Sequence, residues 1–492
     1  MENLSRRRFL QGTAAVAFAG LCTWPVTAQS VAAAPGPFEL AGELKALALS
    51  SGRPVLDAGT GNPNFLHLGA RRAHGQLTQV ALDLTGASGL RPSRSNLGSR
   101  FFRLLDSLPK ETGLAKAVWH KAHEVSGLSF DEVADQLLQM LLGTTYAGFQ
   151  PLARAAALSY QRQELRLSPD DSWHFFPTSG ASEALKLIFE RFTSSGILSP
   201  SRGLAEVVPT FSPFSVWPEL KGDFSIQSVA LEPEQWTLPE ESLRKLADPK
   251  VRVLYLVDPG NPVPTALDDG SVNRLVRLVR EERQDLIILA DSVYGSFVDQ
   301  YNPIISALPK NTIGIGSWSK HFGATGWRLG CLLVHSESVL GPLLDVPLEE
   351  FVNPGPVILP QQGMLTVFSL TQLTEWGQKY DAHLNGLLSK RWKALYDGLG
   401  TTAPSSPRYS HFFAAVSLEQ VAKSNGLKPW PKERELDFLR RLAANHGAVC
   451  LACSGFSGPP GLLRISLASL SEEQSKSLGL SILDVLRRGP LP

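Results

Sequence analysis

The stretch SWSKHFGATGWRLG at residues 317–330 places a lysine in surroundings that favour one kind of covalent chemistry. Lys320 comes three residues after Ser317 and one after Ser319, and Arg328 follows eight residues later. An amine can form a Schiff base with an aldehyde, while hydroxyl donors and a forked cation suit a dianionic phosphate. Glycines in the same loop allow the backbone to approach a ligand closely. A lysine on its own is usually a solvated surface charge, but this spacing predicts a pyridoxal-phosphate site.

Three short apolar runs in the middle of the chain each end at polar residues. They are VLYLV at 253–257, before Asp258 and Asn261; LIILA at 286–290, before Asp291; and TIGIG at 312–316, before Ser317. Continuous apolar runs of this length fit strands buried on both faces. We therefore predict an α/β fold, with a mostly parallel central sheet covered by helices on both faces. Such sheets place ligands beyond the carboxyl ends of their strands, where these polar residues would lie.

An earlier stretch, TSGASEALKLIF at residues 178–189, has a glycine and small residues followed by apolar spacing typical of a helix. The start of such a helix offers free backbone N–H groups and a positive dipole end to an anion. The signal is weak alone, because many helices begin with small residues.

Helical spacing at residues 91–142 indicates a helical segment that covers the main domain. Beyond the sheet, helical spacing at 384–399 and 433–444 and strand-like stretches at 449–451 and 462–467 indicate a smaller α+β domain. The expected division is an export signal at residues 1–28, an N-terminal segment and helical region at 29–142, a large cofactor-binding domain at 143–346 and a small C-terminal domain at 347–492.

The N-terminus has a charged start, a short apolar middle and the small-x-small ending Val26-Thr27-Ala28. This order is typical of a removable signal, and the arginines before Phe9-Leu10 resemble a twin-arginine signal. An arginine-rich tail would explain the arginines but not the order of the three regions. We expect export by the twin-arginine machinery to the periplasm, with no membrane attachment after the signal is removed. That route carries folded proteins, which suits an enzyme that acquires its cofactor before it leaves the cytoplasm.

Composition excludes some partners and leaves one cysteine pair open. The 492 residues include 47 Lys and Arg against 46 Asp and Glu, so no basic excess is available to neutralise nucleic acid. Cys450 and Cys453 have redox or zinc spacing, but they lie in an apolar stretch and lack a second pair or nearby histidines. We expect buried packing for both thiols and no metal site.

In these motifs the chain resembles fold-type I pyridoxal-phosphate enzymes of the class I/II aminotransferase family. Within that family it is most similar to the branch of bifunctional aspartate aminotransferase/aspartate 4-decarboxylases. The resemblance extends over residues 56–467 and is densest at 285–330. It implies the fold-type I architecture, pyridoxal 5'-phosphate as cofactor, an amino donor and a keto-acid acceptor as substrates, and a homodimer or higher homo-oligomer.

The resemblance also implies roles for individual residues. Lys320 is the Schiff-base lysine and proton carrier, and Asp291 pairs with the pyridine nitrogen. Tyr294 and Asn261 serve the cofactor's 3-oxygen, and Phe211 stacks on its ring. The phosphate is bound by Gly180, Ala181, Ser182, Ser317, Ser319 and Arg328, and the neighbouring subunit lends Tyr146 to it.

For the substrate, the resemblance assigns Arg464 to the α-carboxylate and places Thr60 and Gly61 in an early loop that closes over the site. The aspartate 4-decarboxylase pattern has arginine where this chain has Thr60. We therefore expect an exported aminotransferase that acts on an amino acid or on an amino-acid-like group of a secreted metabolite, such as a glutamyl group of a siderophore precursor. The alternatives are an aspartate 4-decarboxylase and a non-catalytic pyridoxal-phosphate-binding protein.

Overall fold

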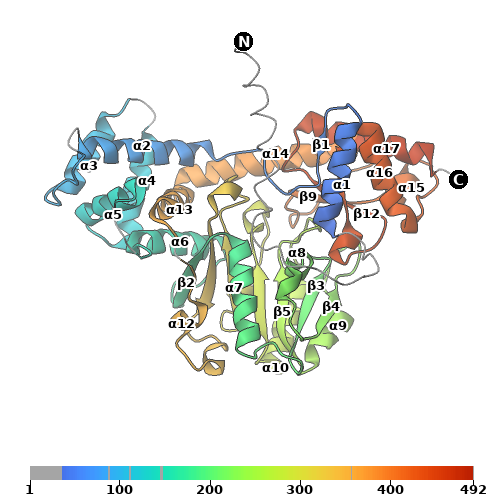
Figure 1. Cartoon of the computed structure of the whole chain (residues 1–492), viewed down its shortest axis with the longest axis horizontal. Coiled ribbons are helices and arrows are strands. Elements are labelled where there is room, and N and C mark those ends of the chain that lie inside the picture. The colour runs from blue at the N-terminus through green and yellow to red at the C-terminus, as the bar shows by residue number, and fades with distance from the viewer. Residues whose placement is uncertain (1–35, 87–88, 110–111, 145–147, 356, 491–492) are drawn as a thin grey trace, which may run out of the picture. The chain divides into compact units, whose positions relative to one another are not determined.

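The computed structural model describes residues 36–86, 89–109, 112–144, 148–355 and 357–490, so the expected export signal and Tyr146 lie outside the described residues. A seven-stranded sheet has the order β2-β8-β7-β6-β5-β3-β4 (Figure 1). Its strands are β2 (Trp173–Thr178), β3 (Gly203–Val208), β4 (Ile226–Ala230), β5 (Val251–Val257), β6 (Ile287–Asp291), β7 (Thr312–Ser317) and β8 (Gly330–His335). Strand β8 is antiparallel to both neighbours and the other pairings are parallel. The predicted mostly parallel sheet is confirmed.

The three apolar runs form β5, β6 and β7, which lie side by side. In the register, Val257 pairs with Asp291, and Asp291 pairs with Ile315. The carboxyl ends of the three strands therefore meet at one edge of the sheet. The loops after these strands carry the polar residues to that edge.

Helices cover both faces of the sheet because its strands are apolar on both sides. On one face, α7 packs Ile188 and Phe189 against strand residues that include Tyr255 and Ile313; Figure 1 shows α7 in front of the sheet. On the other face, α10 and α11 pack on residues such as Leu254 and Ile288, and α6 and α13 pack beside them. These helices are α6 (Pro151–Glu164), α7 (Ala181–Ser194), α10 (Asp269–Glu281), α11 (Ile304–Ala307) and α13 (Leu359–Gln372); the shorter α8 (Pro213–Val216), α9 (Glu240–Leu243) and α12 (Leu348–Val352) lie in the connections.

The helical segment expected before the sheet is present. The expected residues 91–142 contain α3 (Leu97–Ser107), α4 (Gly113–Ser126) and α5 (Phe130–Leu142), and α2 (Leu68–Thr85) precedes them. These helices share an apolar core with α6 and α13, in which Phe101 stacks on Trp119 at 4.8 Å between ring centroids. A capping box at Ser129 and Glu132 starts α5.

The C-terminal elements form a separate small sheet with helices against it. The three-stranded sheet has the order β11-β12-β9, and β10 pairs in parallel with β1. The strand expected at 449–451 is thus divided, because Cys450 lies between β10 and β11 and each of these pairs with a different partner. The elements are α1 (Pro37–Ser50), β1 (Leu56–Asp57), β9 (Phe413–Ser417), β10 (Ala448–Val449), β11 (Leu451–Ala452), β12 (Leu462–Ser466), α14 (Glu375–Leu399), α15 (Leu418–Ser424), α16 (Glu435–His446) and α17 (Glu472–Arg488).

Residues from both ends of the chain share this C-terminal core. Leu40 and Leu44 of α1 pack with Phe438 of α16 and Ile482 of α17. The segment after the expected export signal therefore belongs physically with the small sheet, although it lies far from it in sequence. Both Cys450 and Cys453 are buried free thiols.

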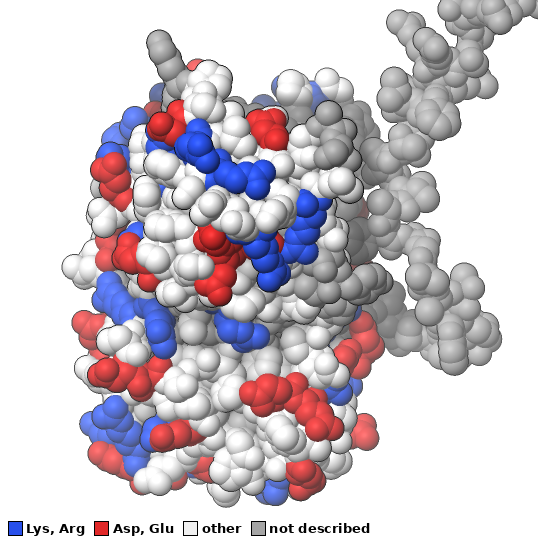
Figure 2. Space-filling view, turned by 90° about the vertical axis from the view of Figure 1, so that its left-hand side faces the viewer, with Lys and Arg blue, Asp and Glu red and all other residues white. Residues whose placement is uncertain are grey.

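The surface carries charges of both signs. Figure 2 shows lysine and arginine interspersed with aspartate and glutamate on one face of the molecule. Among the described residues, no helix is long and apolar enough to cross a membrane.

Candidate active site

A cavity of about 370 Å³ lies at the carboxyl ends of β5, β6 and β7. It brings together most of the residues predicted from sequence: Thr60, Gly61, Ala181, Ser182, Phe211, Asn261, Asp291, Tyr294, Ser317, Ser319, Lys320, Arg328 and Arg464. Gly180 caps the helix whose first two residues line the cavity. Tyr146 lies outside the described residues.

Lys320 reaches into the cavity from the loop after β7. Its Nζ donates to the Gly61 carbonyl at 2.8 Å. Burial lowers the pKa of the Lys320 amine to about 8, and the cations of Arg464 and Arg328 act in the same direction, against the opposing pull of Asp291. A substantial neutral fraction therefore exists near pH 8, and a neutral amine can attack a carbonyl carbon.

Asp291 ends β6 and is buried, with 5% of its surface exposed. Burial raises the pKa of its carboxyl to about 7, although the Val293 N–H, 3.2 Å from Oδ1, and the Lys320 charge favour the ionised form. A buried carboxylate is stabilised by a cation or a charged hydrogen-bond donor placed against it. A protonated ring nitrogen would supply such a donor.

The other end of the cavity is shaped for an anion. Gly180 has φ +88 at the start of α7, and a Cβ there would lie 2.5 Å from Nη2 of Arg328. Without a side chain at this position, the Arg328 guanidinium can lie against the first turn of α7. The N–H groups of that turn, the hydroxyls of Ser317 and Ser319 and the fixed cation are the donor set that a phosphate requires.

Arg464, on β12, is 2% exposed and is held from two sides. Its Nε donates to Asn261 Oδ1 at 3.0 Å, its Nη1 donates to the Gly59 carbonyl at 2.7 Å, and its guanidinium lies 4.1 Å from the centre of the Phe413 ring. Burial lowers the pKa of Arg464 to about 10. The group is therefore a buried cation of fixed orientation, suited to a planar carboxylate.

Gly61 lies between the two cations. A Cβ on Gly61 would lie 3.3 Å from Arg464 Nη2 and 3.7 Å from Lys320 Nζ. The space above this glycine is thus within reach of both a carboxylate-binding group and a reactive amine. An α-amino acid carries a carboxylate and an amine on one carbon, so it has one group for each of these two side chains.

The remaining predicted residues form aromatic walls. Tyr294 packs against Phe412 and Phe413, with ring centroids 5.1 and 5.3 Å away, and burial raises the pKa of its hydroxyl. Phe211 lies on the wall near α7, and the ring of Phe38, from α1, meets it edge-on at 6.0 Å.

Sequence reasoning missed several lining residues, namely Phe38, Asn62, Leu185, Val257, Val293 and Thr325. Leu185, Val257 and Thr325 lie inside the motifs quoted above, and Asn62 and Val293 are chain neighbours of the predicted Gly61 and Tyr294. Phe38 had no such signal, because it lies in a helix more than 20 positions before the early glycine loop.

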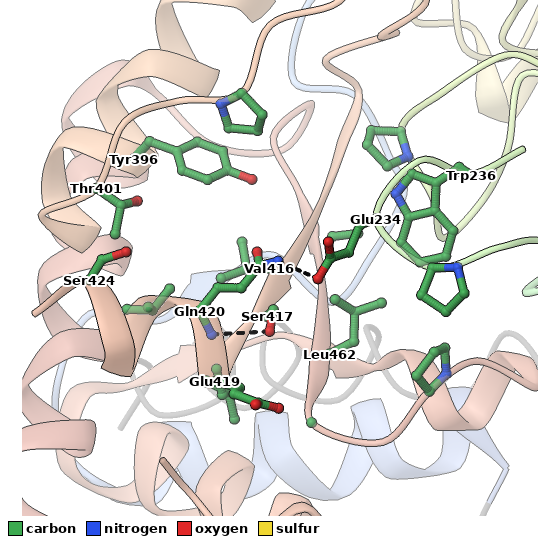
Figure 3. Close-up of a pocket in the computed structure, with 18 of the residues that line it drawn as sticks. Glu234, Trp236, Tyr396, Thr401, Val416, Ser417, Glu419, Gln420, Ser424 and Leu462 are labelled. Atoms are coloured by element: carbon green, nitrogen blue, oxygen red, sulfur yellow. Dashed lines mark hydrogen bonds between the residues drawn. The ribbon is translucent and has the colours of Figure 1, made fainter. Parts of the chain in front are cut away.

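A second, larger cavity of about 540 Å³ lies beside β9 and α15, with Trp236 and Glu234 on one side and Tyr396 on the other (Figure 3). Gln420 Nε2 donates to Glu234 Oε1 there at 2.9 Å. This cavity contains none of the predicted site residues. The chemistry-bearing groups gather in the smaller cavity.

Comparison with known protein families agrees with this geometry. Residues 122–479 match the model of "Aminotransferase class I and II". A bifunctional aspartate aminotransferase and L-aspartate beta-decarboxylase of Pseudomonas sp. is 29% identical over 506 aligned positions, covering 91% of this chain and 94% of that protein. A tyrosine aminotransferase of Mus musculus is 25% identical over 57% of this chain and 60% of its own length.

Solved structures show the same fold. Aspartate aminotransferase of Thermus thermophilus with maleate aligns over 91% of this chain and 96% of its own, with a TM-score of 0.61 and 18% identity. N-succinyldiaminopimelate aminotransferase of Mycobacterium tuberculosis aligns over 90% and 97%, with a TM-score of 0.56 and 17% identity.

The buried charge of Asp291 leads to a prediction for the cofactor-free protein. The folded-state pKa of Asp291 is about 7, above the ordinary 3.8, so the folded protein favours the neutral carboxyl. The contribution of this carboxyl to folding stability is full below pH 3.8 and is lost as the pH rises through 7. Asp291→Asn should therefore stabilise the cofactor-free protein at pH 8 by about 2–4 kcal/mol, and this advantage should vanish near pH 4. Denaturant unfolding at both pH values measures it.

The matched control is Asp299→Asn, because Asp299 is an exposed carboxylate eight residues further along. It should change stability little at either pH. A cofactor-free Asp291→Asn protein that is less stable than wild type at pH 8 would show that the carboxylate is already paired.

Proposed function

Because the chain belongs to the aminotransferase class I and II family, we propose that this pyridoxal-phosphate-dependent transaminase is exported and acts on an amino acid or an amino-acid-like group of a secreted metabolite. One observation carries the assignment: Lys320 Nζ and Arg464 Nη2 both approach the space above Gly61. An amino donor held there has its carboxylate on the arginine and its amine beside the lysine. A keto acid of the same skeleton fits the same space.

The cofactor is pyridoxal 5'-phosphate, and the donor set described above fits it. When bound, its ring accepts the electrons left behind when the α-proton departs. The arrangement supports the following roles. Asp291 stabilises a proton on the ring nitrogen, and the start of α7 with Arg328 binds the phosphate. Asn261 offers its oxygen to Arg464, so its NH₂ is the part that can serve an oxygen of the cofactor.

Lys320 has two tasks in this proposal: to hold the cofactor covalently, and to carry the proton between the substrate carbon and the cofactor. Its lowered pKa suits both, because a base is most effective when its pKa lies near the working pH. Arg464 orients the bond to the α-proton toward Lys320 by fixing the carboxylate. The proposed assembly is a homodimer in which Tyr146 of one subunit serves the phosphate of the other.

Replacing Lys320 with alanine should lower turnover by about 10³-fold or more, because one change removes the covalent link and the proton carrier together. Purified protein would be incubated with a panel of amino donors while keto acid is measured, and the visible absorption of the lysine-bound cofactor would be recorded. Lys310→Ala, an exposed lysine ten residues earlier, is the control and should match wild type. Wild-type turnover in the Lys320 variant would refute the assignment.

The second candidate function is aspartate 4-decarboxylation, favoured by the relative from Pseudomonas sp. that carries both activities in its name. Thr60 bears on this choice, because it lines the cavity in the early loop. Loss of a β-carboxylate requires that second carboxylate to be held while its bond breaks. A guanidinium can do this with charge and two hydrogen bonds, whereas threonine offers one neutral hydroxyl.

Wild-type protein should therefore release more keto acid than carbon dioxide from aspartate, and Thr60→Arg should shift the ratio toward carbon dioxide. Both products are measured from one reaction. Thr60→Ser retains the hydroxyl and should keep the wild-type ratio. Carbon dioxide and alanine as the main wild-type products would instead establish the decarboxylase.

Export is proposed from the N-terminal pattern alone. Changing both Arg6 and Arg7 to lysine should leave a folded, cofactor-loaded enzyme in the cytoplasm, because the described fold begins well after residue 28. Cell fractionation measures the distribution. Arg8→Lys leaves the pair intact and should be exported normally, and normal export of the paired variant would reject the twin-arginine route.

A further inference from the structure

Helix α14 contacts segments next to the active-site residues and carries two polar side chains on one face. Tyr380 and Arg391 are eleven residues apart, which is about three helical turns and about 16 Å along the axis. They therefore point in nearly the same direction. Figure 1 shows α14 running from beside α13 toward α17.

At the first end, α14 holds the loop that follows Lys320. The Tyr380 hydroxyl donates to the His321 carbonyl at 2.7 Å, and Asp381 Oδ1 lies 2.7 Å from Nε2 of the buried His321 ring. Arg71 of α2 donates to the next two carbonyls, those of Phe322 at 2.9 Å and Gly323 at 2.8 Å. Three successive carbonyls after the reactive lysine thus accept from side chains of two helices.

At the second end, Arg391 holds the segments that carry the substrate-binding groups. Its Nη1 donates to the carbonyls of Leu467 at 3.0 Å and Ala468 at 3.2 Å, and its Nη2 donates to Asn64 Oδ1 at 2.9 Å. Leu467 is three residues beyond Arg464, and Asn64 is three residues beyond Gly61. Arg391 is 6% exposed, so these are buried charge-assisted bonds.

Between the two ends, the same face of α14 is apolar and packed. Leu384 and Leu388 are buried in a cluster with Tyr294, Phe297, Phe412 and Phe413. Phe413 supports the Arg464 guanidinium at 4.1 Å. Close packing of this kind transmits small shifts instead of absorbing them.

We propose that α14 is a positioning helix that couples the reactive amine to the carboxylate-binding arginine, with Tyr380 and Arg391 as its two points of attachment. This inference rests on the proposed roles of Lys320 and Arg464. It adds that the two groups are held in register by one rigid element. A displacement at either end changes the distance between amine and carboxylate, and hence the fit of substrate and the pKa of the lysine together.

The test uses Tyr380→Phe, which removes one hydroxyl, and Arg391→Lys, which keeps the charge but cannot reach all three acceptors. Two quantities are measured on the cofactor-loaded enzyme. The first is the pH midpoint of the visible absorption of the lysine-bound cofactor, which reports on the Lys320 end. The second is the Kd of propionate, a simple carboxylate, followed by its effect on the same absorption, which reports on the Arg464 end.

Coupling predicts effects across the helix. Arg391→Lys should shift the absorption midpoint as well as weaken propionate about fivefold, and Tyr380→Phe should weaken propionate as well as shift the midpoint. The double variant should deviate from the product of the single effects. Lys393→Met, which removes an exposed ion pair with Asp397 on the same helix, should leave both quantities unchanged.

If each variant alters only the quantity at its own end, α14 is a passive support and the inference fails. If Arg391→Lys does not fold, Asn64→Ala removes one of its bonds from the loop side and gives the same test. Neither readout requires turnover. An enzyme that binds cofactor but shows no transamination would therefore overturn the proposed function while still deciding the role of α14.

Discussion

The structure depends on gathering three cations and one carboxylate around a single small cavity. Lys320, Arg328 and Arg464 converge there, and Asp291 is the acid among the lining residues that the structure describes. Charges removed from water are costly unless dipoles or counter-ions replace the lost solvation. The backbone carbonyls of Gly61, Gly59 and Thr325 each accept from one of the three cations. The loops that carry these carbonyls must therefore hold them at fixed positions.

Two of these carbonyls belong to segments that lie far from their cations in the sequence. The Lys320 amine meets a carbonyl 259 residues earlier in the chain, and Arg464 meets one 405 residues earlier. Gly59 lies beside the small sheet together with Arg464, but the bonds from Lys320 to Gly61 and from Arg464 to Asn261 join the two sheet regions and depend on their relative position. Buried Arg391 joins these segments through directional bonds, and the aromatic cluster beside it joins them through close packing. In the proposed coupling, the separation of the two cations therefore depends partly on side chains such as Leu384 and Leu388, which do not line the cavity.

Local patterns were sufficient to predict three central strands and the Lys320 loop, whereas residues such as Arg464 and Phe211 were expected only from the resemblance to a known family. The apolar runs at β5, β6 and β7 each end in a side chain that lines the cavity, because parallel strands bring their carboxyl ends to one edge. Other features depend on tertiary packing and left no local signal. Phe38 reaches the cavity only because α1 packs with the C-terminal core, and the stretch at 448–452 is divided because its two halves pair with different strands. The sequence of α14 shows only ordinary amphipathic spacing, and the roles of Tyr380 and Arg391 become visible only from their contacts in the folded structure.

The excess of positive charge also links cofactor binding to stability. A phosphate contributes close to two negative charges at the Arg328 end, and a substrate carboxylate contributes another at the Arg464 end, so the bound cavity is much closer to neutral than the free one. A ligand that binds only the folded state stabilises it by mass action. Burial is the main cause of the lowered pKa of Lys320, and Arg464 and Arg328 add repulsion, which a bound anion would relieve. Binding of cofactor should therefore stabilise the folded protein. An enzyme proposed to cross a membrane already folded would have reason to complete that step first, since its cavity is least favourable when empty.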